Sequence, residues 1–260
     1  MKHMKKLALF CSILLTLVMG SCDALFSNKF QELGLGQVDS AALATANSET
    51  LFAQSGINSG TISQSFIDAA LKDDTTKAAV VAELSTAAGD TDPKVAQTAQ
   101  ALLIEIKLQD TGAKQVVNNM GGLLDLFMSD DTLDPSTPAG MNAIIDTLVP
   151  PDLSDGDLAK VLNDLKDLAN NEVKDFGTNL STNGGLQNDN IDTASIAQTA
   201  VLATVVATLT PADPSVSIGE ALVAALNNTD ETKNFGDFVT VPAGGLDSLT
   251  TDAGLTAIFN

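Results

Sequence analysis

Residue types that support chemistry are scarce in this sequence. It contains one histidine, two cysteines and no arginine, tryptophan or tyrosine. His3 and Cys11 lie in the first 21 residues, which leaves Cys22 as the one later thiol. General acid–base catalysis uses histidine most often, and zinc and copper sites draw on histidine and cysteine. We therefore expect no enzyme, no catalytic residues, no metal site and no cofactor, with a carboxylate-based hydrolase as the remaining enzymatic alternative.

Clusters of acidic residues offer a different chemistry, the binding of a hard cation such as calcium. An EF-hand-like spacing starts at Asn179, but Asn190 stands where the bidentate glutamate belongs. Helix capping and solubility are the simpler interpretation of these acids, and calcium binding is the alternative. The clusters are Asp130, Asp131 and Asp134; Asp152, Asp155 and Asp157; and Asp189 and Asp192.

The first 22 residues have the pattern of an exported N-terminus. Lys2, Lys5 and Lys6 precede an apolar run over 7–19, and two small residues stand before Cys22. An apolar run of about 13 residues is shorter than the roughly 20 that a helix needs to cross the hydrocarbon of a bilayer. The pattern therefore predicts a signal peptide over 1–21 and not a permanent membrane span.

The segment Val18-Met19-Gly20-Ser21-Cys22 resembles the lipobox of bacterial lipoproteins, with Met19 at a position that more often carries leucine. The resemblance implies cleavage before Cys22 and lipidation of Cys22. Two or more acyl chains hold a protein firmly at a membrane, so we expect a lipid-anchored protein of a bacterial cell envelope, at the periplasmic face or the cell surface. An ordinary secretory signal, which would leave Cys22 as a free thiol, is the alternative.

The charge of the chain limits its partners. The first 21 residues hold three of the 13 lysines and none of the 33 acidic residues, so the remainder has a net charge near −23. Nucleic-acid binding draws its affinity largely from lysine and arginine on phosphates, and we therefore expect no nucleic-acid partner. Anionic lipid headgroups are repelled as well. The expected partners are the membrane, through the anchor, and another envelope protein or a lipid.

Beyond a tether at 22–39, apolar residues recur at helical spacing through one expected domain at 40–260. The clearest stripes lie at 95–106 and 158–176. Together they predict an all-α fold, either an irregular multi-helix bundle or a helix-pair solenoid, with little or no β structure beyond a short strand at 235–241. Further helices are predicted at about 41–54, 62–72, 75–88, 113–128, 138–148, 193–209, 217–227 and 247–258.

Polar and glycine residues mark where several of these helices begin and end. Asp92 before Pro93 is a typical helix start, as is Ser154, and Ser217 with Glu220 has the spacing of a capping box. Three glycines are predicted to stop helices, namely Gly89, Gly112 and Gly177.

The segment 193–212 carries no charged residue over 20 positions. Its many Ala, Ser and Thr residues lower its hydrophobicity, so a helix buried by its neighbours is favoured over a membrane-inserting helix. Its small side chains also permit an apolar cavity between helices. The sequence as a whole favours a non-enzymatic binding or structural domain, with a carrier of a lipid or small apolar ligand as the alternative.

Overall fold

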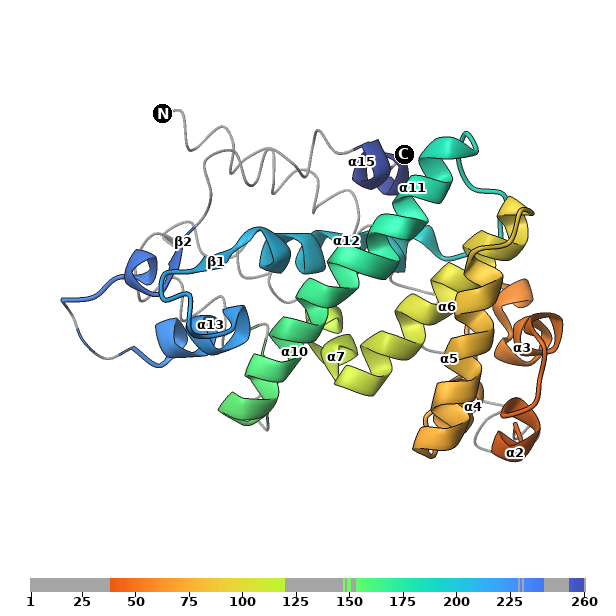
Figure 1. Ribbon diagram of the computed structural model, residues 1–260, viewed down its shortest axis with the longest axis horizontal. Helices are drawn as coiled ribbons and strands as arrows, with labels where there is room; N and C mark the ends of the chain where they lie inside the picture. Colours follow the sequence, from red (N-terminus) through yellow and green to blue (C-terminus); the bar gives the residue numbers. More distant parts are fainter. Residues whose placement is uncertain are drawn as a thin grey trace. The chain divides into compact units, whose positions relative to one another are not determined.

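The computed structural model describes residues 38–119, 147, 149–150, 153–228, 230, 232–240 and 253–259. These residues are predominantly helical, and their only sheet has two short strands (Figure 1). The prediction of an all-α fold is confirmed. Apart from Thr147, the predicted helix at 138–148 lies outside the described residues, as do the second half of that at 113–128, the signal peptide, Cys22 and the tether up to residue 37.

The described residues group into two compact units. Unit 1 takes those between 111 and 170 and between 198 and 240, and unit 2 takes 38–110, 171–197 and 253–259. Each unit therefore combines segments that are far apart in the sequence. Neither is a contiguous domain, and the prediction of one helical domain over 40–260 stays a prediction.

The N-terminal part of unit 2 is a series of capped helices. The predicted helix at 41–54 is divided, because Asn47 Oδ1 accepts a hydrogen bond from Thr50 N and starts a new helix there. The helix α5 packs against the three helices before it, and its Glu83 side chain accepts from Ser48 N at 2.8 Å. The helices are α2 (Ser40–Leu43), α3 (Ser48–Ser55), α4 (Gln64–Ala70) and α5 (Asp74–Ala88), with a 3₁₀ turn η2 (Ile57–Ser59) before α4.

The next helix, α6 (Pro93–Thr111), begins as predicted: Pro93 is its first residue and Asp92 Oδ1 accepts from Lys94 N at 2.9 Å. Every residue of α6 from 96 to 104 is buried, so the helix is enclosed on all sides there. It ends at Gly112, which has a left-handed backbone with a φ of 76°. That conformation is open to glycine with little strain, and the predicted stop at Gly112 is confirmed.

The predicted helical stripe at 158–176 forms α10 (Asp155–Leu168), which continues into a π-helical turn η3 (Ala169–Val173) and then α11 (Lys174–Thr182). The predicted stop at Gly177 is wrong. Gly177 lies buried inside α11, where a Cβ would come within 2.6 Å of the backbone oxygen of Gly254. Glycine stands there because α15 (Ala253–Phe259) packs closely on α11 (Figure 1).

Unit 1 contains α7 (Ala113–Asn118), α10, α13 (Ile218–Leu226) and the sheet of β1 (Thr210–Pro211) and β2 (Val239–Thr240). The strands are antiparallel, with Thr210 opposite Thr240. Of the strand predicted at 235–241, only β2 is strand among the described residues, because Asn234 Oδ1 accepts from Gly236 N and starts a 3₁₀ turn, η4 (Phe235–Asp237). A buried cluster joins α13 and β2 to Val206; it consists of Val206, Ile218, Ala221, Leu222 and Val239.

Helices α10 and α13 approach each other closely in unit 1. A Cβ on Gly219 would lie 1.9 Å from the backbone oxygen of Ala159. Asn163 of α10 completes the contact, because its Oδ1 accepts from Gly219 N at 3.0 Å and its Nδ2 donates to Ser217 Oγ at 3.1 Å. Ser217 and Glu220 form the predicted capping box. The start of α13 is thus bonded both to itself and to α10.

The uncharged segment forms α12 (Thr193–Thr208), and none of its 16 residues is exposed. Seven of these residues are buried and nine are partly buried, so a helix enclosed on every side stays a prediction. Among the helices that the structure describes, none is both long and apolar enough to cross a membrane.

The close contact between α10 and α13 predicts the effect of adding one methyl group. Gly219→Ala should lower the free energy of unfolding by about 1–3 kcal/mol or more, because the new Cβ overlaps a backbone oxygen and one of the helices must move. Gly156→Ala is the matched control, since Gly156 lies on α10 and its Cβ would meet nothing nearer than Ser154 Oγ at 4.0 Å. It should be neutral or slightly stabilising. Urea unfolding followed by circular dichroism measures both variants, and equal effects would contradict the close contact.

Candidate functional site

The most extensive polar arrangement in the described residues begins on α6. Gln97 has no exposed surface and Thr98 is 2% exposed, because both lie in the stretch of α6 that is enclosed on all sides. A buried polar group without a hydrogen bond costs free energy of about 1–3 kcal/mol. The side chains of Gln97 and Thr98 therefore need partners, and they find them on α11 and on the loop that follows it.

Gln97 uses both ends of its amide. Its Nε2 donates to Asn179 Oδ1 at 3.0 Å and to the backbone oxygen of Gly185 at 3.2 Å, and its Oε1 accepts from Gln187 N at 2.7 Å. One side chain of α6 thereby holds the last turn of α11 and two points of the loop at 183–192.

Thr98 extends the same arrangement. Its hydroxyl donates to the backbone oxygen of Lys94 at 2.7 Å and accepts from Asn188 Nδ2 at 2.8 Å. Asn188 is only 1% exposed, and its Oδ1 accepts from Asn190 N at 3.2 Å. We call Gln97, Thr98, Asn179, Gln187 and Asn188 the amide cluster. Its geometry fixes the loop at 183–192 against α6.

The amide cluster contains part of the segment whose spacing resembles an EF-hand. Asn179 lies on α11, and its Oδ1 accepts from Gln97 and also from Asn183 Nδ2 at 3.0 Å. Asn190 donates its backbone N–H within the loop. The side-chain oxygen of Asn179 is thus already bonded to amides. Among the residues that the structure describes, no group of three or more His, Cys, Asp or Glu side chains is placed to hold a metal ion.

Three of the described acids of the predicted clusters accept hydrogen bonds. Asp192 Oδ1 accepts from Ala194 N at 3.1 Å and so caps α12. Asp157 accepts from Ser154 Oγ at 2.6 Å, and Ser154 is the predicted cap of α10. Asp155 accepts from Asn227 Nδ2 at 2.8 Å. The remaining acids of these clusters, except the exposed Asp189, lie outside the described residues: Asp130, Asp131, Asp134 and Asp152.

Several other carboxylates are held ionised by the turns that they cap. The backbone N–H and hydroxyl of Thr76 lower the pKa of Asp73, and the backbone N–H and hydroxyl of Ser217 lower the pKa of Glu220. The hydroxyl and the backbone N–H two residues on lower the pKa of two more acids in the same way, namely Asp213 and Asp230. These hydrogen bonds favour the charged form of the carboxyl groups. The four acids therefore stabilise the turns in which they lie.

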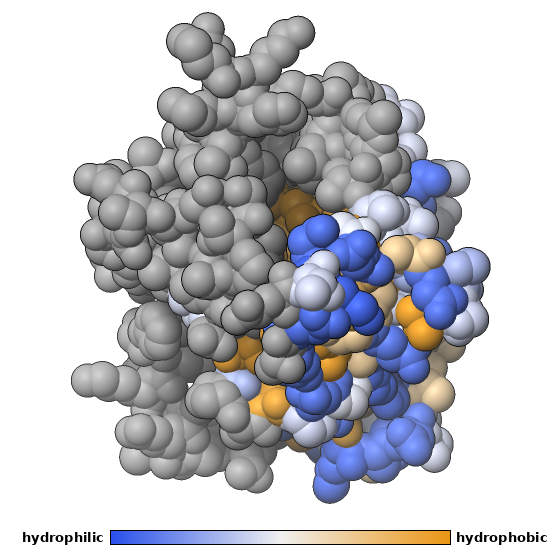
Figure 2. Space-filling model, turned by 90° about the vertical axis from the view of Figure 1, so that its left-hand side faces the viewer, coloured by the Kyte–Doolittle hydropathy of each residue, from blue (hydrophilic) through white to orange (hydrophobic). Residues whose placement is uncertain are grey.

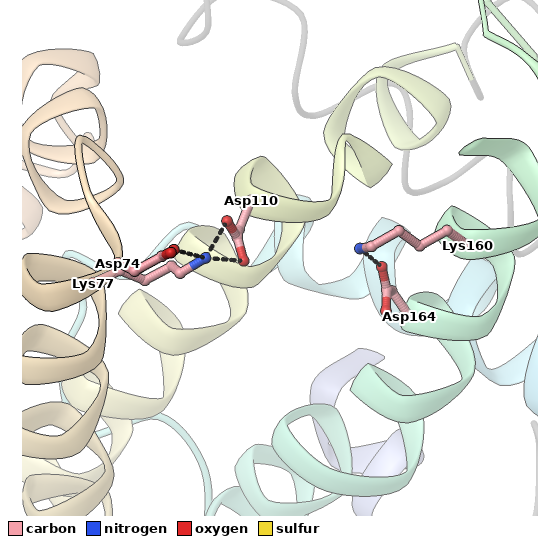
Figure 3. A network of polar contacts seen from close by, with 5 residues as sticks. All are labelled: Asp74, Lys77, Asp110, Lys160 and Asp164. Carbon is pink, nitrogen blue, oxygen red and sulfur yellow. Dashed lines mark hydrogen bonds and ion pairs between the residues drawn. The ribbon is translucent and has the colours of Figure 1, made fainter. Parts of the chain in front are cut away.

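Ion pairs connect some of the few lysines to neighbouring elements. Lys77 of α5 lies 3.0 Å from Asp110 of α6 and 3.5 Å from Asp74, and the hydrogen bond to Asp110 raises the pKa of Lys77 (Figure 3). Lys160 donates to Asp164 one turn along α10 at 2.6 Å (Figure 3). Exposed pairs of this kind contribute at most about 1 kcal/mol each, so they are structural aids rather than a reactive centre.

A third pair, Lys107 with Glu172, joins α6 to the π-helical turn η3. The Glu172 side chain is 14% exposed, and its second oxygen, Oε2, is buried without a hydrogen-bond partner among the described residues. Turns of this type are frequent at functional sites. No sequence signal indicates a π-helical turn, and Glu172 does not belong to any of the predicted acidic clusters.

The sequence analysis did not predict the amide cluster either, although one feature of the sequence indicates it. Residues 95–104 contain no charged side chain between Lys94 and Glu105. An uncharged run longer than two helical turns indicates a helix buried on every side, and a glutamine within it must then be bonded. The only predicted site residue, Cys22, lies outside the described residues.

The described residues expose few large hydrophobic side chains. Val216, at 36%, is the one large hydrophobic side chain that is exposed among the described residues. On the face shown in Figure 2, the described residues are mainly hydrophilic, and hydrophobic ones form smaller patches between them.

Comparisons with family models, curated proteins and solved structures find no match to this chain. No family pattern therefore assigns a role to Gln97, Glu172 or Cys22, and their roles rest on their own contacts and sequence context.

The amide cluster predicts a large cost for removing its central side chain. Gln97→Ala should lower the free energy of unfolding by about 2–4 kcal/mol, because it leaves Asn179 Oδ1 and Gln187 N without Gln97. Gln109→Ala is the matched control on the same helix; its Nε2 bonds only Glu105 of α6, at 3.1 Å, among the contacts described. That variant should change the stability by about 0.5 kcal/mol or less. Amide hydrogen exchange would locate the loss, which should concentrate in the loop at 183–192.

Proposed function

We propose that this chain is a lipoprotein of a bacterial cell envelope, anchored to a membrane through lipid on Cys22. In this proposal the helical part is a non-enzymatic binding or structural domain at the periplasmic face or the cell surface. The observation that carries it is the N-terminal pattern: three lysines, an apolar run over 7–19, and two small residues before Cys22.

Two further observations support a domain that binds or supports and does not catalyse. Histidine and arginine are missing from residues 22–260. Many of the described polar side chains are engaged in caps, ion pairs and the amide cluster, as the examples of Asp73, Glu220 and Gln97 illustrate. The net charge near −23 for the same residues disfavours a nucleic-acid partner. The proposed partners are another envelope protein or a lipid.

The anchor is tested by exchanging one cysteine at a time. Cys22→Ser should abolish incorporation of a labelled fatty acid and move the protein out of the membrane fraction, because the attachment atom is lost. Cys11→Ser is the matched control, since Cys11 lies inside the predicted signal peptide and is the only other cysteine.

Cys11→Ser should leave both labelling and membrane attachment unchanged. Labelling that persists in Cys22→Ser would refute lipidation at this position. An unlabelled wild-type protein whose N-terminus lies at another small residue would favour an ordinary secretory signal.

Carriage of a lipid or small apolar ligand is the second candidate function. It is favoured by α12, whose residues carry no charge and are all at least partly buried. Native mass spectrometry of the protein without its anchor, starting at Asp23, distinguishes the two functions. A carrier predicts extra mass of several hundred daltons that disappears on denaturation. A binding or structural domain predicts the mass of the chain alone, and that result would remove the carrier.

A further inference from the structure

The loop after α11 contains the dipeptide Asn183-Gly184, in which both residues are exposed. Asn183 is the C-cap of α11, and Gly184 follows with a φ of +72°. A Cβ on Gly184 would meet no atom within 4 Å. Gly184 therefore has no side chain to shield its nitrogen, and the place that a side chain would take is open.

The Gly184 nitrogen is a free nucleophile in this setting. The amides on either side of it are engaged: Asn183 N donates to Asn179 O at 3.0 Å, and Gly185 N donates to Leu180 O at 2.8 Å. Gly184 N itself has no hydrogen bond to any described residue. Because it belongs to the residue after Asn183, its attack on the side-chain carbonyl carbon of Asn183 closes a five-membered ring.

The side-chain amide of Asn183 is held only by its own helix. Asn183 Nδ2 donates to Asn179 O at 2.9 Å and to Asn179 Oδ1 at 3.0 Å. These two bonds lie at the exposed Asn183 and can open without breaking the bonds by which Gln97 holds Asn179 and the loop. When they open, the Asn183 side chain is released toward the Gly184 nitrogen.

We propose that Asn183 is a site of spontaneous covalent modification, namely deamidation through a cyclic imide with Gly184. The Gly184 nitrogen attacks Asn183 Cγ and loses its proton, a new N–Cγ bond forms, the Cγ–Nδ2 bond breaks and ammonia leaves. Water then opens the ring. Attack of water at Cγ gives aspartate, and attack at the backbone carbonyl carbon of Asn183 gives isoaspartate. Neither step requires an oxidant or a cofactor.

The modification would act on the amide cluster. It replaces the Nδ2 donor of Asn183 by a carboxylate that faces two acceptor oxygens of Asn179, and Asn179 Oδ1 is the atom that Gln97 also binds. Gln187 Nε2 donates to the backbone oxygen of Asn183 at 3.1 Å, a contact that the longer isoaspartyl backbone displaces. Conversion therefore adds negative charge and loosens the loop that Gln97 holds.

The test incubates the purified protein in mildly alkaline native buffer and follows the peptide that contains Asn183 by liquid chromatography and mass spectrometry. That peptide should gain about 1 Da, the difference between an amide and an acid, and should split into an aspartyl and an isoaspartyl form. Asn183→Asp supplies the chromatographic standard for the aspartyl form.

Two glycine variants decide whether the Gly184 nitrogen is the nucleophile. Gly184→Ala should slow conversion about tenfold or more, because the methyl group crowds the attacking nitrogen. Gly60→Ala is the matched control: Gly60 also has a positive φ, +85°, with no atom within 4 Å of the added Cβ, and it should convert at the wild-type rate. Absence of the mass gain in native buffer, or an equal rate in the two variants, would overturn the proposal.

Discussion

The close approach of helix backbones is the constraint on which both units depend. In unit 1 the backbone oxygen of Ala159 occupies the place that a side chain on Gly219 would take, and in unit 2 Gly254 does the same for Gly177. The chain contains no tryptophan or tyrosine, and at these two contacts a glycine faces the backbone of the neighbouring helix. Small residues instead bring the backbones together, and dense contact between backbones replaces part of the burial that large side chains supply elsewhere.

Close packing of this kind makes the pairing of polar groups more demanding. Where α6 is enclosed on all sides, a glutamine has no water to bond, and Gln97 is satisfied only because α11 and its loop present two acceptors and a donor at the right places. Asn163 has the corresponding role in unit 1, where it bonds Gly219 N and the Ser217 hydroxyl at the start of α13. In unit 1 a side-chain amide thus bridges the close contact between two helices, and in unit 2 one holds the loop after α11 to α6.

The sequence predicts those features that are decided within a few residues. Asp92, Ser154 and the Ser217–Glu220 capping box act as their patterns indicate, because a cap depends on the next three residues alone. Gly177 was misread because glycine serves both at helix ends and at close contacts, and its partner, Gly254, lies far along the chain. Gln97 was missed for a similar reason, since its partners come from residues 179–187. The sequence pattern therefore predicts local features such as caps, but it does not predict contacts between segments that are far apart in the chain.

The strong negative charge has a physical consequence for a protein held by lipid. Acyl chains at Cys22 would draw the N-terminus to the membrane, while the net charge near −23 over residues 22–260 repels anionic headgroups within a Debye length, about 8 Å at physiological ionic strength. Caps such as those at Asp73 and Glu220 lower the pKa of these two carboxyls and favour their ionised form. The two forces act on different parts of one chain. Under the proposed anchoring, the two forces would hold the helical part near the membrane but off its surface.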